Sequence, residues 1–109
     1  MTVKVLAESE VFEPVVLPSP EREITGVYIG DLLSWVMGRA SADEAWITIM
    51  SNVNIVAVAA LCDTALIILA EGVTVDDEVK KAAMTRGINI LSSPKSSFAL
   101  AVEIAELLS

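Results

Sequence analysis

The sequence contains no histidine and a single cysteine, Cys62, among its 109 residues. Without histidine the chain lacks the side chain that most often moves protons near neutral pH. A single cysteine forms neither an intramolecular disulfide nor a cysteine-rich metal site. These absences remove most catalytic and metal chemistry, so we expect no metal, no cofactor and no enzymatic activity.

Basic residues are also scarce, since 7 Lys and Arg stand against 15 Asp and Glu and give a formal net charge of −8. So acidic a chain is a poor partner for nucleic-acid phosphates and for anionic membrane surfaces. Hydrophobic residues make up 54% of the chain and charged residues 20%, which excludes disorder. The length is typical of one domain, so we expect a single domain over residues 1–109.

The uncharged run from Ala45 to Cys62 raises the question of a membrane span, because about 20 apolar residues cross a bilayer. Its middle, residues 51–54, carries a hydroxyl and two amides, which are costly inside a bilayer and typical of a turn. The first residues lack the long apolar core of a signal peptide. We therefore expect a cytoplasmic protein and no membrane partner.

From residue 45 onward, strand and helix patterns alternate. Short apolar runs at 45–50, 65–70 and 88–91 are typical of strands that are covered on both faces. Helices are expected at 55–62, at 75–86, and from Pro94 to the end of the chain. This β-α-β-α-β-α order predicts an α/β fold, a three-layer sandwich with a central, mainly parallel sheet.

Local signals refine these boundaries. Thr74 and Ser93 are predicted to cap the last two helices, and Gly87 to end the first of them. Asp77 is spaced to pair with Lys81 on the same helix. The first 44 residues are less regular: we expect a helix over 3–9 capped by Thr2, strands over 11–17 and 23–29, and a helix from 31 to 37 with Gly38 as its stop.

Ligand-binding loops of parallel sheets lie at the carboxyl ends of the strands. Here these loops are small and polar, and could offer backbone N–H groups to an anion, above all the turn at 51–54. The alternative is that Asp31, Asn54 and Ser93 are simply helix caps. No phosphate-binding glycine loop of known spacing occurs. Cys62 has no neighbouring cation to activate it, so a buried, inert thiol is expected.

The segment Glu21-Arg22-Glu23-Ile24-Thr25-Gly26, continuing to Gly30-Asp31-Leu32-Leu33-Ser34, resembles the DRTGG domain family. The likeness extends through Trp46-Ile47-Thr48, residues 54–59, Glu71-Gly72 and residues 87–91. Arg22, Thr25, Gly26 and Asp31 match the family pattern residue by residue. Val27 replaces the second glycine of the pattern and Glu21 its aspartate; Met50 and Asn52 stand where relatives carry Gln and His.

The resemblance implies a fold like the N-terminal domain of the bacterial kinase/phosphorylase that acts on the phosphocarrier protein HPr. It further implies a non-catalytic regulatory or dimerisation module that acts through a protein or small-molecule partner, with a link to iron hydrogenase systems of anaerobes. The alternative function is a sensor of a nucleotide or phosphorylated metabolite. The residue patterns and the resemblance together give these candidate ligand-binding residues: Arg22, Thr25, Gly26, Asp31, Ser51, Asn52, Asn54, Glu71, Gly72, Ser92 and Ser93.

Self-association is expected as well. The predicted helix over 55–62 is apolar on all sides and presents no polar face to water. Trp35 lies beside the apolar stripe of its own predicted helix. Because surplus apolar surface is commonly covered by a second copy, we expect a closed two-fold homodimer. The competing expectation is a monomer in which the first 44 residues cover this surface.

Overall fold

The computed structural model describes all residues from Met1 to Ser109. The five strands are β1 (Glu13–Val16), β2 (Gly26–Ile29), β3 (Glu44–Thr48), β4 (Leu66–Leu69) and β5 (Asn89–Ser92). The five helices are α1 (Val3–Ala7), α2 (Leu33–Arg39), α3 (Asn54–Cys62), α4 (Asp77–Arg86) and α5 (Ser97–Leu108). None of these helices combines the length and the hydropathy that a bilayer crossing requires.

The strands form one sheet in the order β1-β5-β4-β3-β2. β2, β3, β4 and β5 are parallel neighbours, which confirms the parallel arrangement predicted for the last three. β1 adds to β5 in the antiparallel direction, with an irregularity between Pro14 and Val16. A proline lacks the N–H of a ladder bond, so this strand belongs at an edge of the sheet.

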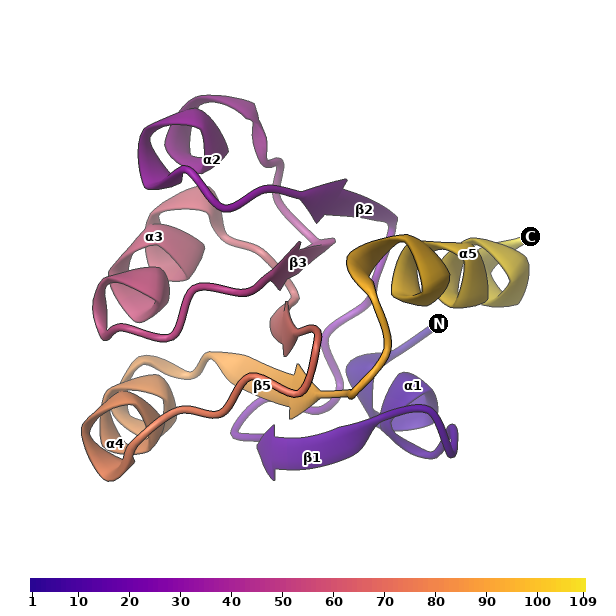
Figure 1. The fold of residues 1–109 in the computed structure, drawn as a ribbon, viewed down its shortest axis with the longest axis horizontal. Helices are drawn as coiled ribbons and strands as arrows, with labels where there is room; N and C mark the ends of the chain where they lie inside the picture. Colours follow the sequence, from indigo (N-terminus) through magenta and orange to yellow (C-terminus); the bar gives the residue numbers. More distant parts are fainter.

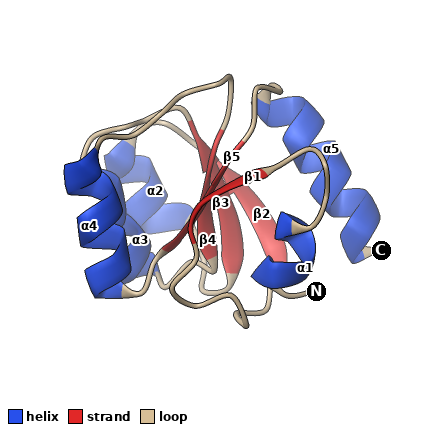
Figure 2. Cartoon of the chain, turned by 90° about the horizontal axis from the view of Figure 1, so that it is seen from below, coloured by secondary structure: helices blue, strands red, loops and turns tan.

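The sheet is covered on both faces, as predicted. Crossovers that step in one direction along a parallel sheet place their helices on the same face, and α2, α3 and α4 share one side (Figures 1 and 2). α1 and α5 cover the other side. All four residues of β4 are fully buried, which explains why its sequence is continuously apolar rather than alternating.

Two apolar cores fill the space between these layers. Leu6, Leu66, Leu100 and Ile104 belong to the core under α1 and α5. Trp46 belongs to the core under α2, α3 and α4, which also contains side chains from each of these helices. The indole Nε1 of Trp46 donates to the carbonyl of Gly30 at 2.9 Å, so this large buried ring keeps its polar atom paired.

Several predicted helix ends are wrong. Asp76, not Thr74, caps α4, since its carboxylate accepts from the Val79 N–H at 3.1 Å. Ser96, not Ser93, caps α5. The reason is tertiary: the segments after β4 and β5 are tied to each other, with Gly72 N–H donating to the Ser93 carbonyl at 3.0 Å. They therefore stay extended longer than their sequences suggest.

At the other helix ends, some predictions are confirmed and others are wrong. α2 continues through Gly38 to Arg39, so this glycine does not stop it. Thr2 caps α1 and Gly87 ends α4 in the left-handed conformation, both as predicted. The expected ion pair between Asp77 and Lys81 does not form. The three salt bridges of the structure all involve Arg22 or the amino terminus.

Candidate functional site

The candidate ligand-binding residues divide between opposite edges of the sheet. Arg22, Thr25 and Gly26 lie before or at the start of β2, at the amino edge. Asp31 follows β2, residues 51–54 follow β3, and Glu71 and Gly72 follow β4. Ser92 ends β5 and Ser93 follows it. This second group is at the carboxyl edge, as predicted. The structure therefore brings eight of the eleven to one edge and separates Arg22, Thr25 and Gly26 from them.

At the amino edge, Arg22 connects two loops. Its guanidinium donates to the Asp43 carboxylate at 2.9 Å, to the Asp63 carboxylate at 3.2 Å and to the Asp63 carbonyl at 2.9 Å. Asp43 and Asp63 both have left-handed backbones, with φ of 68° and 58°, a conformation that costs energy outside glycine. Thr25 N–H donates to the Asp43 carbonyl at 3.0 Å. The Arg22 guanidinium thus has its hydrogen-bond acceptors within the chain.

At the carboxyl edge, Asp31 links β2 to β3. Its carboxylate accepts from the Thr48 hydroxyl at 2.8 Å and from the Ile49 N–H at 2.9 Å. The first residue of α2 is Leu33, and the helix receives no side-chain cap from Asp31. The cap interpretation of Asp31 is therefore wrong, because its carboxylate is engaged by Thr48 and Ile49 of the neighbouring strand segment. Ligand binding by Asp31 stays a prediction.

The turn at residues 51–54 is held by its own atoms. The side-chain oxygen of Asn52 accepts from the Asn54 N–H at 2.9 Å. Asn54 is the first residue of α3 and does not cap this helix. Ser51, Asn52 and Asn54 are exposed. Ligand binding by this turn stays a prediction.

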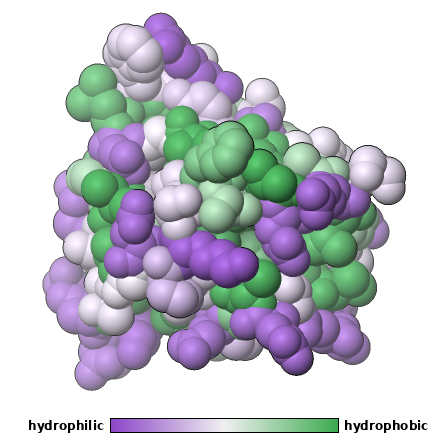
Figure 3. All heavy atoms as spheres, turned by 45° about the vertical axis from the view of Figure 1, so that its right-hand side comes forward, coloured by the Kyte–Doolittle hydropathy of each residue, from purple (hydrophilic) through white to green (hydrophobic).

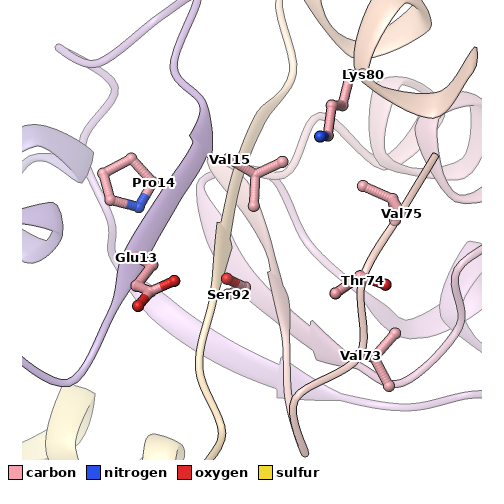
Figure 4. Close-up of a pocket in the computed structure, with 8 residues that line it drawn as sticks. All are labelled: Glu13, Pro14, Val15, Val73, Thr74, Val75, Lys80 and Ser92. Carbon is pink, nitrogen blue, oxygen red and sulfur yellow. The ribbon is translucent and has the colours of Figure 1, made fainter. Parts of the chain in front are cut away.

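The hollows at the carboxyl edge lie farther along the sheet, beside β5. One has a volume of about 200 Å³ and is lined by side chains of β1, α4 and the segment 73–75, with Ser92 of β5 (Figure 4). Figure 4 shows Glu13 and Lys80 on opposite sides of this hollow. A second hollow of about 260 Å³ adjoins it and adds Gly72, Ser93 and Pro94. Three predicted residues, Gly72, Ser92 and Ser93, thus line a concave surface.

Sequence reasoning missed Glu13, Thr74 and Lys80 as members of this site. Lys80 lies on α4, and nothing in the local sequence indicates that this helix faces the edge strand β1. Glu13 reaches the hollow because β1 pairs with β5, a contact between distant parts of the chain. Glu71 lies nearby with a left-handed backbone at φ 58°, and its N–H donates to the Lys95 carbonyl at 2.9 Å.

Other reactive groups lie outside this site. Cys62 is partly rather than fully buried, and this burial raises the pKa of its thiol, which donates to the Val36 carbonyl at 3.5 Å. The predicted inertness of this thiol stays a prediction. Trp35 is exposed and carries the Arg39 guanidinium 3.7 Å from its ring centroid. No three His, Cys, Asp or Glu side chains come together as a metal site would require.

The fold and the edge hollows define a three-layer α/β domain with a concave carboxyl edge. No family model matches the sequence, and no curated protein does. Among solved structures the chain is similar to the CBS and DRTGG domains of the regulatory region of Clostridium perfringens pyrophosphatase, complexed with its activator diadenosine tetraphosphate. The TM-score is 0.64 and the identity 18%, over 81% of this chain and 39% of that one.

The chain therefore spans well under half the length of that pyrophosphatase region. At this identity the likeness concerns the fold, and it supports the DRTGG-like fold expected from the resemblance. The pyrophosphatase segment belongs to the regulatory region of that protein.

Proposed function

We propose that residues 1–109 form one non-catalytic regulatory domain that senses a small anionic metabolite at the carboxyl edge. The observation that carries the proposal is the hollow between β1, α4 and the segment 73–75, which is lined by the Lys80 cation and by the side chains of Thr74 and Ser92 (Figure 4). Ligands of open α/β sheets bind at this edge. A hollow lined by a cation and by hydroxyl groups suits a phosphate or a carboxylate.

The size of the hollow limits the ligand. Its volume of about 200 Å³ is below the roughly 300–1,000 Å³ of sites that enclose drug-sized molecules. A phosphate group or a small phosphorylated acid suits it better than a whole dinucleotide. Glu13 on the opposite side would accept a hydrogen bond from a hydroxyl or ammonium group of the ligand.

The regulatory character has separate support. The similar solved structure is a regulatory region whose ligand is a phosphate-rich activator. Within this chain, histidine is absent, and Arg22 and Asp31 are engaged in contacts that join loops and strands. An association with a hydrogenase system is implied by the family resemblance alone and stays a prediction.

The test is a ligand titration of the isotope-labelled protein, followed by amide chemical shifts and thermal unfolding. The probes are inorganic phosphate, three-carbon phosphorylated acids, ATP and diadenosine tetraphosphate. We expect saturable shifts at residues 72–75 and 92–94 and a ligand-dependent rise in Tm. Lys80→Ala should abolish both effects, whereas Lys81→Ala, the next residue but outside the hollow, should retain them. Absence of saturable shifts with every probe would overturn the proposal.

A second candidate function is self-association, as a dimerisation module. The observation that favours it is exposed apolar surface: Phe98 is 76% exposed, and Val102, Ile29 and Leu32 are exposed too. Figure 3 shows apolar side chains gathered on the face where α5 and the end of β2 lie. Sedimentation over a range of concentrations tests it, and a mass of 11.6 kDa at every concentration would exclude it.

A further inference from the structure

The outer surface of the helical layer α2–α4 contains a groove between α3 and α4. It has a volume of about 420 Å³ and an apolar floor formed by Val53, Val56, Ala57 and Ala82. Lys81 and Arg86 of α4 line it, and no acidic residue does. Ala57 and Leu61 lie four residues apart on α3, so they share one face of that helix. Leu61 is 70% exposed, and it extends the apolar surface beyond the groove.

The two cations of the groove have no partner within the molecule. The chain carries more than twice as many acidic as basic residues, yet neither Lys81 nor Arg86 takes part in any of its salt bridges. α3 contributes no charged residue at all. The groove is therefore a basic and apolar surface on a strongly acidic protein, and an acidic and apolar surface would complement it.

Such a surface exists on the opposite layer. α5 carries no basic residue, and Phe98, Val102 and Glu106 recur every four residues along its solvent-facing side, where all three are exposed. Glu103 lies beside this stripe. Neither glutamate takes part in a salt bridge. The outer face of α5 thus combines apolar anchors with unpaired carboxylates.

We propose that the outer face of α5 of one copy docks into the α3/α4 groove of another copy; this rests on the proposed self-association and names its surfaces. A two-fold contact through α5 would bring the glutamates of both copies together. A two-fold contact through the groove would bring Lys81 and Arg86 together with their own equivalents. Only the head-to-tail combination pairs opposite charges, and like charges across an interface oppose association.

The contact is heterologous, because α5 and the groove lie on opposite faces of the sheet (Figure 2). A copy that is docked through α5 keeps its own groove free for another copy. Association therefore proceeds beyond two copies as concentration rises, to a ring if the rotation closes or to a chain if it does not. This distinguishes the contact from the closed two-fold dimer expected from the sequence.

A charge exchange tests the contact. The groove variant combines Lys81→Glu with Arg86→Glu, and the helix variant combines Glu103→Lys with Glu106→Lys. Each variant alone places like charges on both surfaces, so we expect association at least roughly tenfold weaker than that of the wild type in sedimentation. Mixed in equal amounts, the two variants regain opposite charges at both contacts and should associate as the wild type does. Added salt should weaken association of the wild type and of the mixture.

A matched control keeps the result specific. Lys4→Glu with Lys95→Glu changes the net charge as the groove variant does, at exposed sites outside both surfaces, and should associate as the wild type does at the same salt. Circular dichroism verifies that each variant is folded. A wild type that stays monomeric would overturn both the contact and the self-association. A two-fold dimer whose association is the same in the wild type and in both charge variants would overturn the proposed contact and would still support self-association.

Discussion

The Asp31 carboxylate accepts a hydrogen bond of 2.8 Å from the hydroxyl of Thr48, a fully buried residue at the end of β3. The same carboxylate oxygen accepts from the Ile49 N–H at 2.9 Å. One side chain thereby connects the edge strand β2 to the strand beside it, at the edge where ligands of this fold class bind. Its removal should weaken that connection.

Asp31→Ala should lower the free energy of unfolding by about 1–3 kcal/mol, because it leaves a buried hydroxyl and a backbone N–H without an acceptor. Asp31→Asn keeps a carbonyl oxygen at the same place and should cost less than half as much. Urea denaturation of both variants measures the difference. Equal losses in the two variants would show that charge, not hydrogen-bond acceptance, is what matters there.

Two buried threonines should respond in opposite directions to replacement by valine. The Thr64 hydroxyl is buried without a hydrogen-bond partner, so Thr64→Val should raise the free energy of unfolding by about 1 kcal/mol. The Thr48 hydroxyl donates to Asp31 and accepts from the Met50 N–H at 3.1 Å. Thr48→Val should therefore destabilise, by about 1–3 kcal/mol. Thermal unfolding compares them, and destabilisation in both would contradict the expectation for Thr64.

The two tryptophans should differ sharply when each is replaced by phenylalanine. Trp46 is fully buried and donates to the Gly30 carbonyl, so Trp46→Phe should cost about 2 kcal/mol through a cavity and a lost hydrogen bond. Trp35 is 54% exposed and contacts Arg39; Trp35→Phe should cost less than about 1 kcal/mol. Each variant also isolates one indole for fluorescence, where the remaining Trp46 should emit at shorter wavelength than the remaining Trp35.

The Cys62 thiol should react slowly with alkylating reagents. Burial disfavours its charged form and raises its pKa, so the reactive thiolate is rarer at pH 8 than in an ordinary cysteine. Alkylation by iodoacetamide should be slower than that of free cysteine at pH 8 and should accelerate as the pH rises toward the elevated pKa. Unfolding in urea removes the burial and should restore the ordinary rate. A folded-state rate equal to that of free cysteine would contradict this prediction.

The sheet was predictable because its central strands are buried on both faces. A run such as Leu66–Leu69 is too short for a typical helix and too apolar for an exposed strand, so its role follows from solvent exclusion alone. Helix starts were less predictable. Thr74 and Ser93 have the chemistry of caps, but the hydrogen bonds between the segments after β4 and β5 hold the chain extended past them.

The candidate site was predictable only where it depends on strand order. Gly72, Ser92 and Ser93 follow from the rule that parallel strands present their carboxyl ends at one edge. Glu13 and Lys80 complete the hollow through the pairing of β1 with β5, for which no local pattern exists. Arg22, Thr25 and Gly26 came from family resemblance, which carries no information on which edge of a sheet a residue occupies.

The position of β1 has a consequence for the order of folding. β2, β3, β4 and β5 are neighbours in space in the order of synthesis, so each can dock as soon as its connecting helix forms. β1 alone must wait for the last strand, and its pairing closes a loop that runs from residue 13 to residue 92, whose entropy opposes early formation. Val15→Ala or Val16→Ala, at the partly buried positions of β1 that pack against the core, should therefore accelerate unfolding and leave the refolding rate nearly unchanged. Because β1 also supplies one wall of the hollow, the hollow would be the last part of the molecule to be completed.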